Sequence, residues 1–245
     1  MQLMTKQSKT SSKGSKIVPK AQNYQCTYCK KKFGKEETLI THICVKKRRF
    51  AEIHSPESRL GFRAFQRFFD LSTNSKTTKT ATEFVDSQFY TEFIKFGIHI
   101  ATLKPVHPDK FIDFVIKNNV KIRDWTKDSI YYTYIEHLIK TEPAIGAIER
   151  SITEISKWTD KNRAVFSDFF SLVSPNEAAH MIQTGKISPW ILYLSINGGN
   201  LLSQFTTDHT RVVGTMIEPS FWLKKFKQNS EDVEYIKSVL AGTNL

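Results

Sequence analysis

Two cysteines and a histidine near the N-terminus have the spacing of metal ligands. Cys26 and Cys29 are separated by two residues, and twelve residues lie between Cys29 and His42. Two thiolates on a tight turn and an imidazole on a facing helix can converge on one tetrahedral ion, and zinc binds such donors. The spacing therefore predicts a zinc site, with Zn²⁺ as the cofactor.

The fourth ligand is less clearly marked. Another histidine or cysteine is expected three to five residues after His42, but the nearest is Cys44, with one residue between. Residues i and i+2 lie about 200° apart on a helix, so both reach one ion only if the helix ends or unwinds near Ile43. We expect Cys44 to complete a Cys3His site that uses all three cysteines. If Cys44 is instead a buried thiol, His54 or a water completes the site.

The segment that carries these ligands resembles the Cys2His2 zinc-finger family. The resemblance covers about 20 residues, and Tyr24, Phe33 and Leu39 fill the three apolar core positions. It departs from the family at Cys44, which makes the site a CCHC variant. The resemblance implies a ββα unit that zinc locks in place.

The resemblance also implies where nucleic acid makes contact. With Glu36 as the first helical residue, the positions that face bases are Lys35, Thr38 and Thr41. A single finger covers only about 3 bp, so base reading is expected to be weak. Phosphate contacts have more support, because basic residues flank the expected helix. These are Lys30, Lys31, Lys32 and Lys35 before it, and Lys46, Lys47, Arg48 and Arg49 after it.

The positive charge of the chain is concentrated at its N-terminal end. The 245 residues have a formal net charge of +12; residues 1–50 carry 13 Lys and Arg against two acids, and the remainder carries 23 against 22. Such asymmetry is typical of a segment that meets a polyanion, because each neutralised phosphate releases counterions. The partner is therefore expected to be DNA or RNA, unless the lysines serve only solubility.

Composition divides the chain into three parts. Residues 1–23 contain five lysines, no acid and no aromatic residue, which predicts a flexible basic arm. The zinc finger is expected over residues 24–50 and an all-α domain over residues 51–245. The longest uncharged stretch, Ile187 to Thr207, is broken by polar residues and glycines, so we expect no membrane span. We expect a reducing compartment, cytoplasmic or nuclear, and not secretion.

The all-α prediction rests on repeated helix starts and on apolar residues at three- and four-residue spacing. Ser174 and Glu177 have the spacing of a capping box, and Pro143 is expected to open a further helix. Residues 72–80 are polar and predict an exposed loop, and Ala241 and Gly242 are expected to end the last helix. The four helix starts are Ser55-Pro56, His107-Pro108, Ser174-Pro175 and Ser188-Pro189.

Aromatic and basic residues in the helical region allow two interpretations. Arg59, Arg63 and Arg67 form a stripe that either extends the nucleic-acid surface or is a solvated face, whereas Phe62, Phe65 and Phe69 are expected in the core. Two further groups are expected in the core rather than as stacking platforms for bases. These are Tyr131, Tyr132 and Tyr134, and Phe166, Phe169 and Phe170.

Catalytic patterns are weak in this chain. Gly185-Lys186 is not preceded by the glycine-rich run of a phosphate-binding loop or followed by its hydroxyl residue. Asp109 with Glu154 and Lys157 only faintly resembles the active site of a metal-dependent nuclease. The sequence therefore favours a non-catalytic nucleic-acid-binding protein, regulatory or accessory in DNA or RNA metabolism. The alternatives are a protein-interaction module that docks on a polymerase or other assembly, and a nuclease that holds its substrate with the finger.

Overall fold

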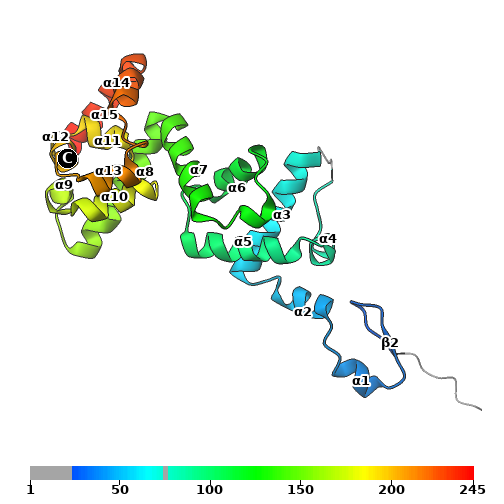
Figure 1. Ribbon diagram of the computed structural model, residues 1–245. Coiled ribbons are helices and arrows are strands. Elements are labelled where there is room, and N and C mark those ends of the chain that lie inside the picture. Colours follow the sequence, from blue (N-terminus) through cyan, green and yellow to red (C-terminus); the bar gives the residue numbers. More distant parts are fainter. Residues whose placement is uncertain (1–23, 74–76) are drawn as a thin grey trace, which may run out of the picture. The chain divides into compact units, whose positions relative to one another are not determined.

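The structure is a computed structural model that describes residues 24–73 and 77–245 (Figure 1). The predicted basic arm, residues 1–23, lies outside the described residues. The chain divides into two compact units, one ending at Glu52 and the other running from Ile53 to Leu245. The structure is 72% helical, and its described part contains one small two-stranded sheet, which confirms the predicted fold class.

The first unit contains the sheet and two short helices. Its strands pair antiparallel with Tyr24 opposite Phe33, as a β-hairpin requires. The first helix begins at Glu36, as predicted, and its five residues make little more than one turn. The elements are β1 (Tyr24–Gln25), β2 (Lys32–Phe33), α1 (Glu36–Ile40) and α2 (Val45–Glu52).

The regular elements of the second unit are all helices in its described residues, and they include two 3₁₀ turns, Ile122–Asp124 and Phe166–Asp168. None of the helices in residues 24–73 and 77–245 combines the length and the apolar character that a membrane span needs. Its α-helices are α3 (Pro56–Thr73), α4 (Ala81–Asp86), α5 (Tyr90–Leu103), α6 (Pro108–Lys117), α7 (Asp128–Thr141), α8 (Ala144–Asn162), α9 (Phe169–Leu172), α10 (Pro175–Gln183), α11 (Pro189–Leu194), α12 (Ile196–Ser203), α13 (Thr207–Val213), α14 (Pro219–Gln228) and α15 (Ser230–Thr243).

The four predicted helix starts are confirmed. α3, α6, α10 and α11 each begin with the proline, which has no backbone N–H to leave unpaired. Three of the preceding residues also accept a hydrogen bond from a backbone N–H of the first turn, namely Ser55, Ser174 and Ser188. α8 begins directly after Pro143, as predicted.

Other helix ends differ in detail from the prediction. Ser174 accepts a hydrogen bond from the backbone N–H of Glu177 at 3.2 Å, which is one half of the predicted capping box. A box with both halves joins Thr80 and Glu83 at the start of α4. The expected loop over residues 72–80 begins later, because α3 continues to Thr73; residues 74–76 lie outside the described residues.

The predicted end of the last helix is wrong by a few residues. α15 continues through Gly242 to Thr243. Asn244 then ends it with a left-handed backbone, φ 55°, and donates its N–H to the carbonyl of Leu240. Asparagine adopts this conformation more readily than most residues, so it terminates the helix that the glycine does not.

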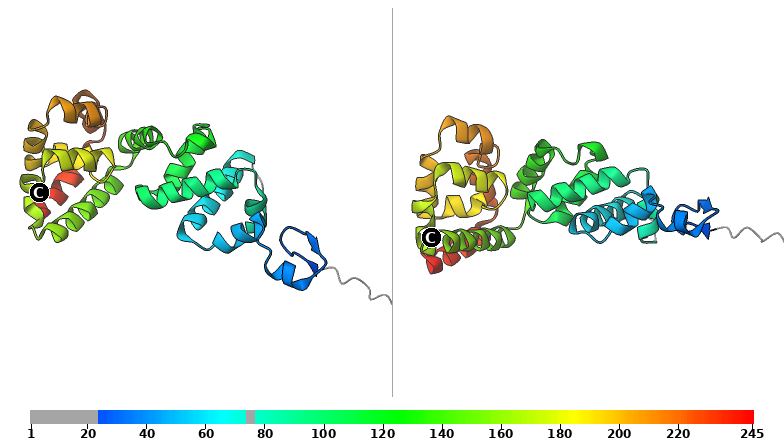
Figure 2. Two further views of the ribbon diagram at one scale, coloured as in Figure 1. Left: turned by 60° about the horizontal axis from the view of Figure 1, so that its bottom comes forward. Right: turned by 90° about the horizontal axis from the view of Figure 1, so that it is seen from below.

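α3 and α5 pack closely against each other (Figure 2), and a glycine of each helix lies at the contact. A Cβ on Gly61 of α3 would lie 2.6 Å from the carbonyl oxygen of Phe93 on α5. A Cβ on Gly97 of α5 would collide with the carbonyl oxygen of Glu57 on α3. The two backbones therefore pack at a distance that only glycine permits at these positions.

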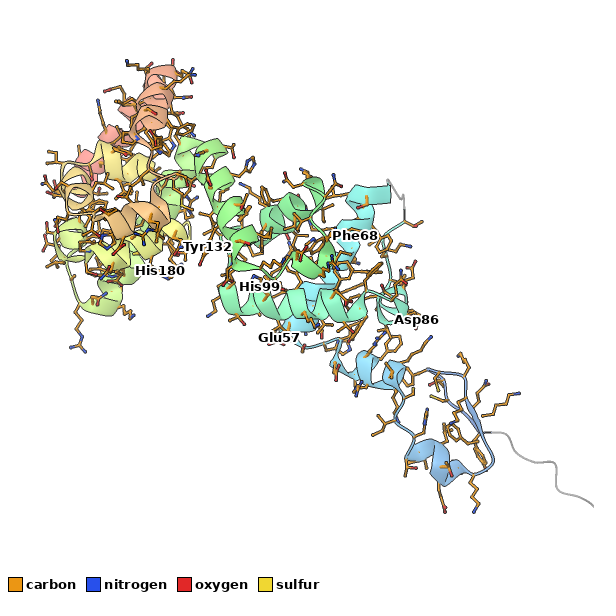
Figure 3. All side chains as sticks on the ribbon, in the orientation of Figure 1. Glu57, Phe68, Asp86, His99, Tyr132 and His180 are labelled. Atoms are coloured by element: carbon orange, nitrogen blue, oxygen red, sulfur yellow. The ribbon has the colours of Figure 1, made fainter. Side chains whose placement is uncertain are left out.

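Aromatic side chains fill the core beside this crossing. Phe65 is buried, as predicted, and packs edge-on against Phe93 with ring centroids 5.4 Å apart. Phe68, labelled in Figure 3, contacts both Phe93 and Trp125, at 5.9 and 6.1 Å. Trp125 is fully buried, so the 3₁₀ turn before it is anchored to α3 and α5.

The two aromatic groups considered for base stacking belong mostly to the core. Tyr131 and Tyr134 are buried, and their hydroxyls donate to the carbonyls of Thr184 and Val106. Phe169 and Phe170 are also buried. Tyr132, labelled in Figure 3, is the exposed member, with 38% of its surface accessible.

Candidate metal centre

The β-hairpin positions the first two cysteines. The backbone N–H of Cys26 donates to the carbonyl of Lys31 at 2.9 Å, and the N–H of Lys30 donates back to the carbonyl of Cys26 at 3.0 Å. Lys30 has a left-handed backbone, φ 61°, which turns the chain sharply after Cys29. This tight loop presents the sulfurs of Cys26 and Cys29 to the same side.

His42 follows the end of α1. Its backbone N–H donates to the carbonyl of Leu39 at 3.2 Å, so the chain makes one more turn beyond the helix. Its ring packs against Phe33 of β2, with ring centroids 4.7 Å apart. His42 Nε2 lies 3.3 Å from Cys29 Sγ. The predicted small core of the unit thus positions the imidazole next to the hairpin cysteines.

Cys44 reaches the same place because the chain is not helical between α1 and α2. Its carbonyl accepts the N–H of Arg48 at 3.0 Å, and its Sγ accepts the N–H of Lys47 at 3.3 Å. Cys44 is therefore the N-terminal cap of α2, a position usually held by serine, threonine or aspartate. The expected break in the helix near Ile43 is confirmed.

The four donor atoms form one compact group. The nitrogen and sulfur atoms of Cys26, Cys29, His42 and Cys44 all lie within 4.8 Å of one another, and Cys26 Sγ is 4.0 Å from Cys44 Sγ. Zn–S bonds of about 2.3 Å in a tetrahedron require sulfur atoms about 3.8 Å apart. The group has the composition and dimensions of a metal-binding site. It does not include His54.

Local hydrogen bonds change the acidity of two ligands. The backbone N–H of Cys29, followed by that of Tyr28, lowers the pKa of the Cys26 thiol to about 7 against the opposing effect of burial. The backbone N–H of Lys31 acts in the same direction on Cys29, but burial and the neighbouring Cys26 and Cys44 outweigh it and raise the pKa of that thiol. Of these two thiols, Cys26 therefore ionises at the lower pH, and the thiolate is the form that binds a metal.

The basic residues of the first unit that are predicted to bind nucleic acid differ in their exposure to solvent. Lys30, Lys31, Lys32, Lys35 and Arg48 are exposed, whereas Lys46, Lys47 and Arg49 are half-buried. Thr38 and Thr41 are exposed, but the hydroxyl of Thr41 already donates to the carbonyl of Glu37 at 3.0 Å. The exposed positive charge lies mainly on the hairpin and its connection to α1.

The arginine stripe of α3 has a different arrangement from either sequence interpretation. Arg67 donates to both carboxylate oxygens of Asp113 on α6, at 2.6 and 2.5 Å, and this contact raises its pKa. Arg63 pairs with Asp109 on the same helix. Arg59 is exposed. Two of the three arginines are therefore neutralised by α6, and their predicted contact with nucleic acid stays a prediction.

The acidic residues considered for catalysis do not form a metal-binding group. Glu154 pairs with Lys157 on the same helix, and Asp109 is held by Arg63. Across residues 24–73 and 77–245, the Cys3His set is the one group of three or more such side chains with converging ligand atoms. His99 and His180, both labelled in Figure 3, lie on different helices, α5 and α10.

Sequence reasoning missed two features of the site. The N-terminal cap at Cys44 carries no sequence signal, because cysteine is rare at that position. The aspartates that hold Arg63 and Arg67 lie 46 residues further along, although their four-residue spacing matches that of the arginines. No protein-family model, curated protein or solved structure matches the chain.

Proposed function

We propose that Cys26, Cys29, His42 and Cys44 bind one structural Zn²⁺ and that residues 24–50 form a CCHC variant of the Cys2His2 finger. Three thiolates and an imidazole suit zinc better than Mg²⁺ or Ca²⁺, which take oxygen ligands. Four protein donors also leave no open position for a substrate, which is typical of structural sites. The convergence of these four donor atoms within 4.8 Å carries the proposal.

Metal analysis of two variants tests the ligand set. One zinc per chain is expected in the wild type, and Cys44→Ser should lose most of its zinc affinity. His54→Ala is the matched control, since it removes the alternative ligand. Full zinc affinity in Cys44→Ser together with loss in His54→Ala would assign the fourth ligand to His54 instead.

We further propose that this unit binds nucleic acid, mainly through phosphates, in a regulatory or accessory role. The exposed lysines of the hairpin region support it, because they carry positive charge into solvent beside the metal group. Weak base reading follows from the single turn of α1, which is too short to lie along a groove with several side chains. The excess of basic over acidic residues in residues 1–50 also favours a negatively charged partner such as nucleic acid.

The salt dependence of binding tests this proposal. With roughly four to six phosphate contacts, the affinity of the full chain for duplex DNA should fall with a logarithmic slope of about −4 to −5. The triple variant Lys30→Gln, Lys32→Gln, Lys35→Gln should reduce that slope by about 2.7. The control has the same charge change at exposed lysines of the second unit: Lys161→Gln, Lys224→Gln, Lys227→Gln. A flat salt response, or equal effects of both variants, would refute phosphate binding by the finger.

One observation favours a second candidate, a protein-interaction module. Three apolar side chains of the first unit are largely exposed: Ile40 at 67%, Ile43 at 77% and Val45 at 54%. A contiguous patch of exposed apolar side chains often marks a protein-binding surface, and these three lie within six residues of the chain. If this candidate holds, Ile43→Ser should abolish retention of a partner assembly while zinc content and nucleic-acid affinity stay unchanged.

A further inference from the structure

A small cavity lies between α6 and α7, outside the metal centre. Its volume is about 280 Å³, slightly below the usual range of about 300 to 1,000 Å³ for ligand pockets. The walls are partly aromatic and partly basic. The principal lining residues are Lys110, Phe114 and Lys117 from α6, and Tyr134, His137 and Thr141 from α7.

The acidic residues of this cavity are already neutralised. Asp113 receives two hydrogen bonds from Arg67, and Glu142 receives two from Arg150. Lys110 and Lys117 are exposed, and the described residues offer neither of them an ion-pair partner. The cavity therefore presents two positive charges to an incoming ligand, so the ligand it suits is an anion.

The spacing of the lining residues indicates which kind of anion the cavity suits. Lys110, Phe114 and Lys117 are related as i, i+4 and i+7, so they share one face of α6, with Phe114 between the two lysines along the helix. The lysine backbones lie about 10.5 Å apart along the helix. The rings of His137 and Tyr134, which also line the cavity, pack directly against Phe114 with ring centroids 5.5 and 5.6 Å apart. This cluster of three aromatic rings thus has a lysine on each side along α6.

We propose that this cavity binds one unpaired nucleotide of a single strand. The base stacks on Phe114, and the phosphates on its two sides pair with Lys110 and Lys117. A nucleotide inside a strand has phosphates in this arrangement, and stacking on an aromatic side chain is the usual mode of single-strand binding. This inference rests on the proposed nucleic-acid function, but it concerns a different unit and a different form of nucleic acid.

The test uses the full chain with zinc and fluorescence anisotropy of a labelled oligodeoxythymidine over a range of salt. The charge variant is Lys110→Gln with Lys117→Gln, and the stacking variants are Phe114→Leu and Phe114→Trp. The charge control is Lys224→Gln with Lys227→Gln, two exposed lysines of α14. The same DNA sequence as a duplex and free thymidine monophosphate are the comparison ligands.

Each variant has a distinct expected effect. The charge variant should weaken single-strand binding and reduce the logarithmic salt slope by about 1.4, since each lost phosphate contact contributes about 0.7 on single strands. Phe114→Leu should weaken binding about five-fold or more without changing the slope, and Phe114→Trp should restore it. The control and duplex binding by all cavity variants should match the wild type.

Three results would overturn this inference. Wild-type single-strand binding in the charge variant and in Phe114→Leu would exclude the cavity while leaving the finger proposal intact. Thymidine monophosphate bound as tightly as the oligonucleotide, with the same response to the variants, would mean a free nucleotide as ligand. Absence of any nucleic-acid binding by the full chain would overturn the inference and the proposed function together.

Discussion

The backbone N–H of Lys47 donates to Cys44 Sγ at 3.3 Å, so the fourth residue of the candidate metal centre is also the N-terminal cap of α2. This helix has no buried residue in the structure, and its first turn contains no acidic side chain. Eight residues without a buried face are too few to remain helical alone in water. α2 therefore depends on its contacts with the rest of the unit, among them the cap at Cys44 and the packing of Phe50 on Tyr28.

Metal removal should unfold the first unit and leave the second. A chelator is expected to abolish the amide protection of residues 24–52, including α2, while most of the helical circular dichroism from the second unit remains. The variant Cys44→Ser separates loss of the metal from loss of the helix cap, because serine preserves a capping oxygen but is a poor zinc ligand. Hydrogen exchange is the measurement. Persistent protection of α2 in the chelated protein would contradict its dependence on the metal.

The pair between Arg67 and Asp113 is expected to stabilise the packing of α3 on α6. Their side chains are 33% and 21% exposed and share two hydrogen bonds, so Arg67→Gln should lower the free energy of unfolding by about 0.5 to 1 kcal/mol. Arg59→Gln is the matched control and should change it by less than about 0.5 kcal/mol. Urea unfolding of Arg67→Gln, of Asp113→Asn and of the double variant that carries both substitutions gives the coupling energy. A neutral Arg67→Gln would mean that the pair contributes nothing.

Arg150 and Glu142 form a more deeply buried pair. Their side chains are 9% and 3% exposed, and Arg150 Nε also donates to the carbonyl of Gly185 at 2.6 Å. Arg150→Met should cost about 3 to 5 kcal/mol of unfolding free energy, because it leaves the Glu142 carboxylate buried without a partner. Adding Glu142→Gln should recover part of that loss. Urea unfolding measures both variants, and a double variant less stable than Arg150→Met would contradict this explanation.

Acid should weaken the start of α4 through Glu83. The Lys79 ammonium, then the backbone N–H and hydroxyl of Thr80, lower the pKa of Glu83 to about 2. Because the folded pKa lies below the unfolded value of 4.5, the contribution to stability is complete above about pH 4.5 and is lost as the pH falls through about 2. Melting curves should separate wild type from Glu83→Gln near pH 6 and converge near pH 2. A constant difference over that range would exclude this carboxylate as the cause.

Features that depend on neighbouring residues were predictable from the sequence. The helix starts at Pro56, Pro108, Pro175 and Pro189 rest on a proline and the residue before it, so they need no information about the rest of the fold. The convergence of Cys26, Cys29 and His42 was predictable for the same reason, because a tight hairpin and one short helix bring them together. These are local interactions, and local chain geometry is sufficient to determine them.

Only the tertiary structure decided features that join distant residues. Arg63 and Arg67 have the spacing of a solvent-facing stripe, yet α6 supplies Asp109 and Asp113 to them across 46 residues. The cavity beside Phe114 likewise exists because α7 packs on α6. No periodicity within one helix indicates which helix will pack against it, because that choice depends on the packing of the whole core. The sequence by itself therefore determined the helix starts and the residues of the candidate metal centre, and the tertiary packing determined which charged side chains are left without an ion-pair partner.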